Sequence, residues 1–190
     1  MGKTIRNLLL TGVGLAGVTA ILVSFKVAQS NREFDNTPIT QPFDADRYLG
    51  KWYEIARYNH KFQREMTGCT AVYTLKSKGK ILVTNQGYRN GKFHESIGHA
   101  KITDENGLLR VSFFRPFYSD YRVLMLAPDY SYALVGSNRQ KYLWILSRTP
   151  ILPPDVLNTI LKEARGRGYD TQKLMWVQNQ NVKQLIPDTN

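Results

Sequence analysis

The sequence predicts an all-β fold: an eight-stranded antiparallel up-and-down barrel with one C-terminal α-helix packed outside it, preceded by an N-terminal hydrophobic helix. Two observations predict the barrel and its helix. Short β-favouring runs separated by turn signals fill residues 50–147, at the spacing expected of an all-β barrel. An apolar stripe at helical spacing then follows Pro153 and Pro154, and eight strands is the number that closes a small barrel.

The strands are bounded by turn residues. Asn90-Gly91 and Asn106-Gly107 are dipeptides typical of tight hairpins. The expected strands are residues 50–58, 70–75, 81–88, 93–102, 108–114, 121–126, 132–135 and 142–147. The helix is expected between Pro154 and Gly166 or Gly168, because proline favours a helix start and glycine a helix end. Residues 174–177 could form a final strand.

The N-terminal residues 1–27 are expected to be a signal-anchor or a signal peptide. Lys3 and Arg6 precede an uncharged run, residues 8–25. As a helix, this run spans about 27 Å, close to the hydrocarbon thickness of a bilayer. The apolar region of a cleaved signal is usually shorter, so an uncleaved anchor is favoured. A stripe of small residues could pair two such helices and leaves a homodimer open. The stripe consists of Gly12, Ala16 and Ala20.

The remaining chain divides into three parts. Residues 28–42 are polar and contain Pro38 and Pro42, which indicates a tether. Residues 43–178 form the barrel with its helix, and residues 179–190 form a C-terminal tail.

Composition narrows the classes of function. The formal net charge is +11, which favours a solvated basic surface and leaves an anionic lipid surface as an alternative. The lone Cys69 excludes an internal disulfide. There is no G-x-S-x-G, H-E-x-x-H or P-loop motif, and His60, His94 and His99 show no ligand spacing, so these histidines are expected on the surface. We therefore expect no enzyme, no metal and no cofactor.

Residues 113–118 (FFRPFY) combine aromatic rings with Arg115 and could stack on nucleic-acid bases. The membrane leader argues against nucleic acid as a partner.

Three separated blocks carry a family resemblance. Residues 50–55 (GKWYEI), 128–135 (PDYSYALV) and 144–150 (WILSRTP) resemble the lipocalins, specifically bacterial lipocalins of the outer-membrane lipoprotein type related to apolipoprotein D. The match runs from Phe43 to Gln178. Two departures stand out. The leader has no cysteine to carry a lipid, and Cys69 is alone where apolipoprotein D-like members pair cysteines.

Side-chain parity and the resemblance together select the residues of the barrel interior. With Trp52 inward, Glu54 and Ala56 share its face. The predicted ligand-binding residues are Glu54, Ala56, Ala71, Tyr73, Asn85, Val111, Phe113, Tyr121, Val123, Met125 and Trp144. Gly50, Trp52 and Arg148 are assigned to the structure of the closed end, and the resemblance implies that Arg148 stacks on Trp52.

The resemblance and the leader together imply binding, storage or transport of a small lipophilic ligand, a fatty acid or lysophospholipid, at the bacterial cell envelope. The domain is expected in the periplasm, anchored by the N-terminal helix or associated with the outer membrane. A structural or interaction protein with a filled barrel remains the alternative, and a small-molecule enzyme is less favoured.

Overall fold

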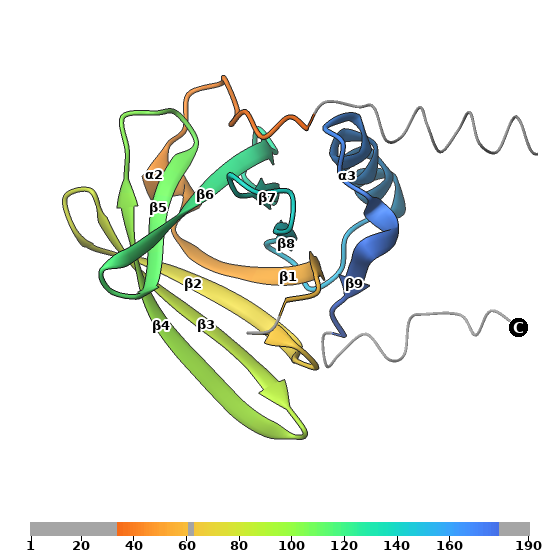
Figure 1. Cartoon of the computed structure of the whole chain (residues 1–190), viewed down its shortest axis with the longest axis horizontal. Coiled ribbons are helices and arrows are strands. Elements are labelled where there is room, and N and C mark those ends of the chain that lie inside the picture. Colours follow the sequence, from red (N-terminus) through yellow and green to blue (C-terminus); the bar gives the residue numbers. More distant parts are fainter. Residues whose placement is uncertain (1–33, 61–62, 179–190) are drawn as a thin grey trace, which may run out of the picture. The chain divides into compact units, whose positions relative to one another are not determined.

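Pairing between consecutive strands closes one antiparallel sheet into a barrel. A computed structural model describes residues 34–60 and 63–178 (Figure 1). Its strands are β1 (Gly50–Tyr58), β2 (Thr67–Ser77), β3 (Lys80–Arg89), β4 (Lys92–Ile102), β5 (Leu108–Phe114), β6 (Phe117–Leu126), β7 (Tyr132–Gly136) and β8 (Leu143–Ser147). Strand β1 pairs with both β8 and β2, which completes the ring. The predicted eight-stranded barrel is confirmed.

Three further elements complete the described chain. Helix α3 (Pro154–Gly166) packs outside the barrel, with a proline in its first turn as the sequence predicts. The short helix α2 (Ala45–Tyr48) precedes β1, and the side chain of Asp44 accepts hydrogen bonds from its first backbone N–H groups. After the 3₁₀ turn η2 (Thr171–Lys173), strand β9 (Leu174–Trp176) adds to β1.

The β3–β4 hairpin is longer than its neighbours. Asn90 and Gly91 both have positive φ, 51° and 72°, as a tight two-residue hairpin turn requires. Strand β4 pairs with β5 only over residues 99–102. The hairpin therefore projects beyond that pairing at the end of the barrel where Tyr58 and Thr67 lie (Figure 1). We call this the open end.

Apolar side chains form two separate clusters. One fills the barrel near α2 and includes Trp52, Tyr73 and Leu109. The other lies between the barrel wall and α3 and includes Leu134 and Ile160. Alternation along β7 and β8 divides neighbouring residues between the two clusters, as expected for strands buried on both faces.

Two β-bulges change this alternation. The register of β1 shifts between Glu54 and Ala56, and the register of β6 shifts between Val123 and Met125. A bulge adds one residue to a strand and reverses the side on which later residues lie. Ala56 and Met125 accordingly belong to the cluster against α3. The prediction that these two residues face the barrel interior is wrong.

Residues 34–42 pack against the barrel, so the prediction of a tether is wrong for them. The backbone N–H of Ile39 donates to the carbonyl of Val123 at 2.8 Å, and the Asn106 side chain donates to the carbonyl of Ile39 at 3.0 Å. The ring of Phe34 lies 5.1 Å from that of Tyr169, centroid to centroid. This segment is part of the folded domain.

The predicted leader, its stripe of small residues, the first part of the tether and the tail of residues 179–190 lie outside the described residues. Within residues 34–60 and 63–178, the structure contains no helix that is long and apolar enough to span a bilayer.

Candidate ligand-binding site inside the barrel

Trp52 and Arg148 seal the end of the barrel near α2. The Trp52 side chain is fully buried, and the guanidinium carbon of Arg148 lies 3.9 Å from the centroid of its ring. Arg148 also donates to the backbone carbonyls of Lys51 at 2.9 Å and Arg47 at 2.8 Å. Gly50 has a φ of +91°, and a Cβ there would approach Arg148 to 3.4 Å. These contacts make this end closed to solvent.

Three tyrosine hydroxyl groups form the floor above Trp52. The hydroxyl of Tyr121 lies 2.7 Å from that of Tyr48 and 2.9 Å from that of Tyr73. Burial raises the pKa of all three phenols, that of Tyr73 to about 12. The hydroxyls therefore stay protonated at neutral pH and satisfy one another inside the apolar floor.

Above the floor, inward-facing side chains keep accessible surface. Ala71 and Asn85 are paired in register on β2 and β3 and are half-buried, as is Val111 on β5. Phe113 is 36% exposed, and its ring covers Gly98, where a Cβ would meet it at 2.8 Å. These inward-facing groups keep solvent-accessible surface, unlike Trp52 and Tyr73 nearer the closed end.

A buried ion pair lies on one wall of this space. Because of the β1 bulge, Arg57 pairs in register with Trp144, faces inward and forms an ion pair with Glu54. The side chain of Gln63 connects Glu54 to Trp144. Its amide nitrogen donates to the Glu54 carboxylate at 3.0 Å, and its side-chain oxygen accepts from the Trp144 indole at 3.3 Å. Arg57 also donates to the backbone carbonyls of Gln63 and Met66. The charges are thus paired with each other and with the chain that follows β1.

Burial controls protonation around this pair. Burial raises the pKa of Glu54, and the neighbouring Arg57 and Gln63 oppose the rise. The pKa of the Cys69 thiol is raised to about 12 by burial and by the charge of Glu54. Cys69 is therefore a neutral thiol at physiological pH, which is the opposite of an activated nucleophile.

His60 differs from the surface position expected for it. It is half-buried, and its ring lies 5.5 Å from that of Trp144 and 5.7 Å from that of Tyr142. Burial, with the charge of Arg57, lowers the pKa of His60 to about 4, so the imidazole is neutral at pH 7. Among the described residues, no group of three or more His, Cys, Asp or Glu side chains is placed to hold a metal ion.

The predicted ligand-binding residues thus fall into four groups. Those that face the interior and keep accessible surface are Ala71, Asn85, Val111, Phe113, Tyr121 and Trp144. Glu54 also faces inward, but it is buried in its ion pair with Arg57. Tyr73 and Val123 also face inward but lie in the packed floor, where they are at most 4% exposed. Ala56 and Met125 lie outside, against α3.

Sequence reasoning missed Arg57, Gln63 and Cys69, which line the interior wall. Once a bulge is allowed between Glu54 and Arg57, the three-residue spacing of opposite charges is compatible with one side of a strand. No residue of the strand by itself identifies the bulge.

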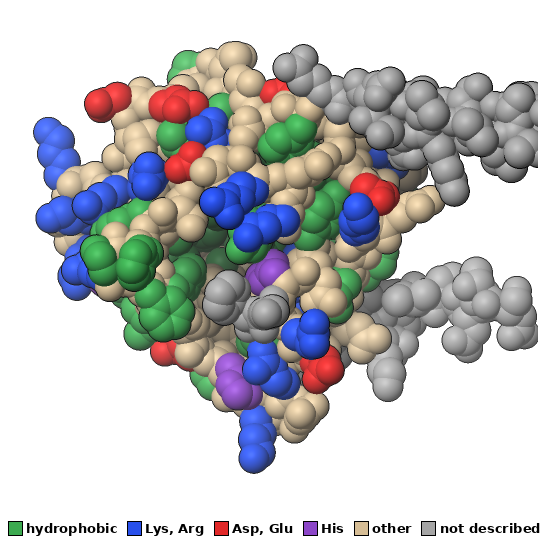
Figure 2. Space-filling view, in the orientation of Figure 1, with side chains coloured by type: hydrophobic (Ala, Val, Ile, Leu, Met, Phe, Trp, Pro, Cys, Tyr) green, Lys and Arg blue, Asp and Glu red, His purple; other side chains and the backbone are tan. Residues whose placement is uncertain are grey.

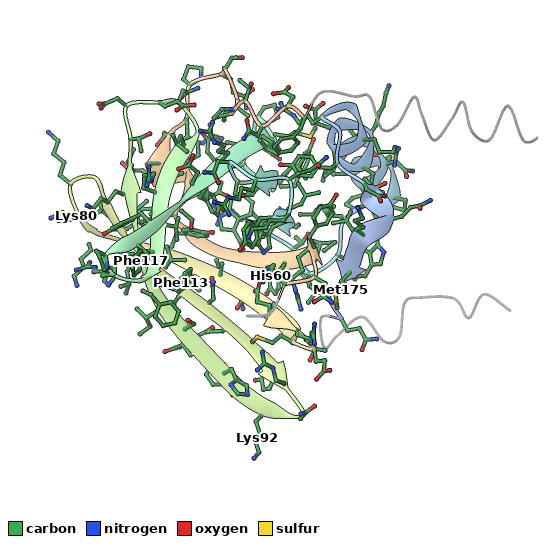
Figure 3. All side chains as sticks on the ribbon, viewed as in Figure 1. His60, Lys80, Lys92, Phe113, Phe117 and Met175 are labelled. Carbon is green, nitrogen blue, oxygen red and sulfur yellow. The ribbon has the colours of Figure 1, made fainter. Side chains whose placement is uncertain are left out.

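A groove lies elsewhere, on the outer surface beside β9. It has a volume of about 730 Å³ and is lined by Tyr58, Asn59, Gln140, Lys141, Asp170, Lys173 and Met175. None of the predicted ligand-binding residues lines it. Figure 3 shows Met175 on the side of the molecule away from Phe113 and Phe117.

Comparisons with known proteins agree with this architecture. The sequence profile of the lipocalin-like domain matches residues 43–179. Outer membrane lipoprotein Blc of Escherichia coli is 44% identical over 144 residues, which cover 74% of this chain and 81% of the relative. Apolipoprotein D of Mus musculus is 32% identical over 161 residues, covering 78% of this chain and 84% of the relative.

A solved structure shows the same fold. Insecticyanin from the tobacco hornworm, Manduca sexta, aligns with a TM-score of 0.63 and 22% identity over 77% of this chain and 86% of its own. The profile match covers the barrel, its helix and the sealed end built by Trp52 and Arg148. The chain belongs to the lipocalin family.

Proposed function

We propose that this lipocalin binds, stores or transports a single-chain lipid, a fatty acid or a lysophospholipid, in the open half of its barrel. The observation that carries the proposal is the accessible surface of the inward-facing Ala71, Asn85 and Val111. Membership of the lipocalin family supports a small hydrophobic ligand. Burying an acyl chain contributes about 0.8 kcal/mol per methylene, so affinity requires few polar contacts.

The proposed orientation follows from the distribution of polar groups. The acyl chain would lie against Ala71, Val111 and Phe113, above the tyrosine floor. The polar head would remain nearer the open end, where Gln63 and the Trp144 indole meet. Ligand pockets are mostly apolar with a few polar groups that fix orientation, and this arrangement has that composition.

The proposed location is the cell envelope, with the barrel in the periplasm. The Blc relatives of E. coli and Vibrio cholerae are named as outer membrane lipoproteins, which supports association with a membrane. How residues 1–27 contribute remains a prediction from sequence, because they lie outside the described residues.

The experiment uses the full chain purified from cells. Native mass spectrometry with organic extraction should identify a bound single-chain lipid. The delipidated protein should bind fatty acids or lysophospholipids, with a change in Trp144 fluorescence, more tightly than two-chain phospholipids. Failure to bind any lipid of this panel would refute the proposal and favour a filled barrel.

A lumen-filling variant gives a sharper test. Ala71→Phe should weaken binding about tenfold or more, which corresponds to about 1.4 kcal/mol, because the ring occupies the proposed acyl space. Thr74→Phe is the matched control, because Thr74 lies on the exposed outer face of the same strand. Equal binding by both variants would place the ligand outside the barrel.

A further inference from the structure

Three phenylalanines gather at the turn between β5 and β6. Phe114 and Phe117 face each other in register across the turn and are 73% and 77% exposed, and Phe113 beside them is 36% exposed. We call these residues the aromatic tip. Figure 3 shows Phe113 and Phe117 together on one side of the barrel. Clustered exposed aromatic rings are unfavourable in water and mark an interaction surface.

Cationic side chains lie on the outer wall next to this tip. Lys80 of β3, Lys101 of β4 and Arg110 of β5 occupy one register row across the sheet. The Lys101 ammonium lies 4.7 Å from the centroid of the Tyr118 ring, and Tyr118 follows Phe117 in β6. This contact connects the row of cations to the aromatic tip.

Two more cations lie close to the same wall. Lys76 is exposed near the end of β2, and Arg115 is in the turn that carries the aromatic tip. Arg110 is paired with Asp120. We therefore leave Arg110 out and call the other four cations, Lys76, Lys80, Lys101 and Arg115, the basic row. Figure 2 shows Lys and Arg side chains beside a hydrophobic patch on this side of the molecule.

Two carboxylates on the neighbouring strands are engaged by other groups. Asp120 lies opposite Arg110, but it pairs with Arg110 at 3.4 Å and with Arg122 at 3.0 Å. Glu95 of β4 accepts a hydrogen bond from Gln86 at 2.9 Å and lies towards the β3–β4 turn. The four cations of the basic row are all exposed to solvent.

We propose that the aromatic tip and the basic row bind the surface of an anionic phospholipid bilayer. Aromatic rings partition into the headgroup region of a membrane, and lysine and arginine are attracted to anionic headgroups there. A second copy of the chain fits this surface less well, because the formal net charge of +11 makes two copies repel each other. Bilayer binding at this surface does not depend on which ligand the barrel holds.

The location of the tip gives this surface a function. Phe113 is both a member of the aromatic tip and a wall residue of the barrel interior, where its ring covers Gly98. Binding of the tip to a bilayer therefore brings Phe113, and the part of the barrel interior that its ring lines, next to the lipid layer. A single-chain lipid could then pass between the bilayer and the barrel over a short path.

The test uses an indole introduced at the tip of the full chain. In the Phe117→Trp variant, vesicles of phosphatidylcholine with phosphatidylglycerol should shift the emission of the new indole to shorter wavelength, and brominated acyl chains should quench it. Added salt should reverse both effects, since it screens the attraction between exposed charges. Absence of the shift and of quenching would overturn the proposal.

Two matched variants locate the contact. Ile151→Trp places an indole at an exposed apolar position, 43% exposed, just after β8 at the closed end. It should show neither effect, and any contribution of residues 1–33 to membrane binding is the same in both variants. Adding Lys101→Glu and Arg115→Glu to Phe117→Trp should abolish the shift. Equal quenching at both positions, or no effect of the charge reversals, would overturn the proposed surface.

One further outcome identifies a different occupant. An emission shift of the Phe117→Trp variant that appears without vesicles and grows with protein concentration would assign the aromatic tip to a second copy of the chain. Analytical ultracentrifugation would then show the dimer, and the bilayer proposal would be overturned. Ligand retention in the barrel is measured separately, so its failure is distinguishable from failure of membrane binding.

Discussion

Replacing Arg57 by methionine tests the buried ion pair inside the barrel. The side chains of Arg57 and Glu54 are only 1% and 7% exposed. Methionine keeps much of the apolar volume of arginine and removes its charge. Glu54 would then be a buried carboxylate without its cation, and the hydrogen bonds to the carbonyls of Gln63 and Met66 would be lost. Removing one partner of such a pair costs about 3–5 kcal/mol, a large part of the stability of an ordinary domain.

The loss of folding free energy caused by Arg57→Met should depend on pH. Burial already raises the pKa of Glu54 above its ordinary value, and without Arg57 it rises further. A carboxyl whose pKa is higher in the folded state stabilises the fold at low pH and loses that contribution as pH increases through the folded pKa. The destabilisation caused by Arg57→Met should therefore be larger at pH 7 than at mildly acidic pH, where Glu54 is protonated.

The double variant separates loss of the pair from loss of packing. In Glu54→Leu/Arg57→Met no buried charge remains, and apolar replacements of buried ion pairs are often neutral or stabilising. The double variant should therefore be more stable than Arg57→Met. Urea unfolding followed by tryptophan fluorescence measures each free energy.

An exposed ion pair provides the control. Lys173 and Asp170 are 3.5 Å apart, with side chains 70% and 40% exposed, and Lys173→Met should cost less than about 1 kcal/mol. The reasoning is refuted if Arg57→Met costs no more than this control. It is also refuted if the effects of the two substitutions at the buried pair simply add.

Three further predictions concern other parts of the fold. Burial lowers the pKa of His60 from 6.5 to about 4. The wild type should therefore lose folding stability as pH falls from about 6.5 to about 4. His60→Phe should lose less stability over the same range, as measured by urea midpoints in a pH series. Gly136→Ala should cost about 1–3 kcal/mol in thermal unfolding, because its Cβ would collide with the Tyr169 hydroxyl and approach Leu124 to 2.8 Å. Arg148→Lys should cost about 1–3 kcal/mol in guanidinium unfolding, because lysine cannot reproduce the planar stacking and forked hydrogen bonds of the guanidinium.

The features of the fold that depend on local chemistry could be predicted from sequence. Asn90-Gly91 predicts the β3–β4 turn because both residues tolerate positive φ, and both adopt it. Pro154 predicts the start of α3. Strand ends were less predictable: β6 begins at Phe117, before the expected Tyr121. Pairing with β5 extends it, and that long-range contact has no local signal.

The candidate site was predictable only in part. Alternation from Trp52 predicts an inward Glu54, which the ion pair with the inward Arg57 matches. Ala71 was selected by the family resemblance, and the structure pairs it in register with Asn85. Alternation then fails at each bulge, because the extra residue reverses the side on which all later residues of the strand lie. The exposure of the inward-facing residues also depends on how the strands pair, since β4 pairs with β5 only over residues 99–102. No single residue predicts the extent of that pairing.

The two bulges explain how one barrel wall serves both a polar interior and an apolar helix contact. Each bulge turns two successive apolar residues outward, Ile55 with Ala56 and Leu124 with Met125, and α3 packs on this widened apolar face through Ile160. Without the β1 bulge, Arg57 would face the α3 cluster as an uncompensated charge, which is strongly unfavourable. With the bulge, Arg57 reaches Glu54 inside. The insertion that defeats prediction by alternation is therefore the feature that makes the helix contact and the interior ion pair compatible in one strand.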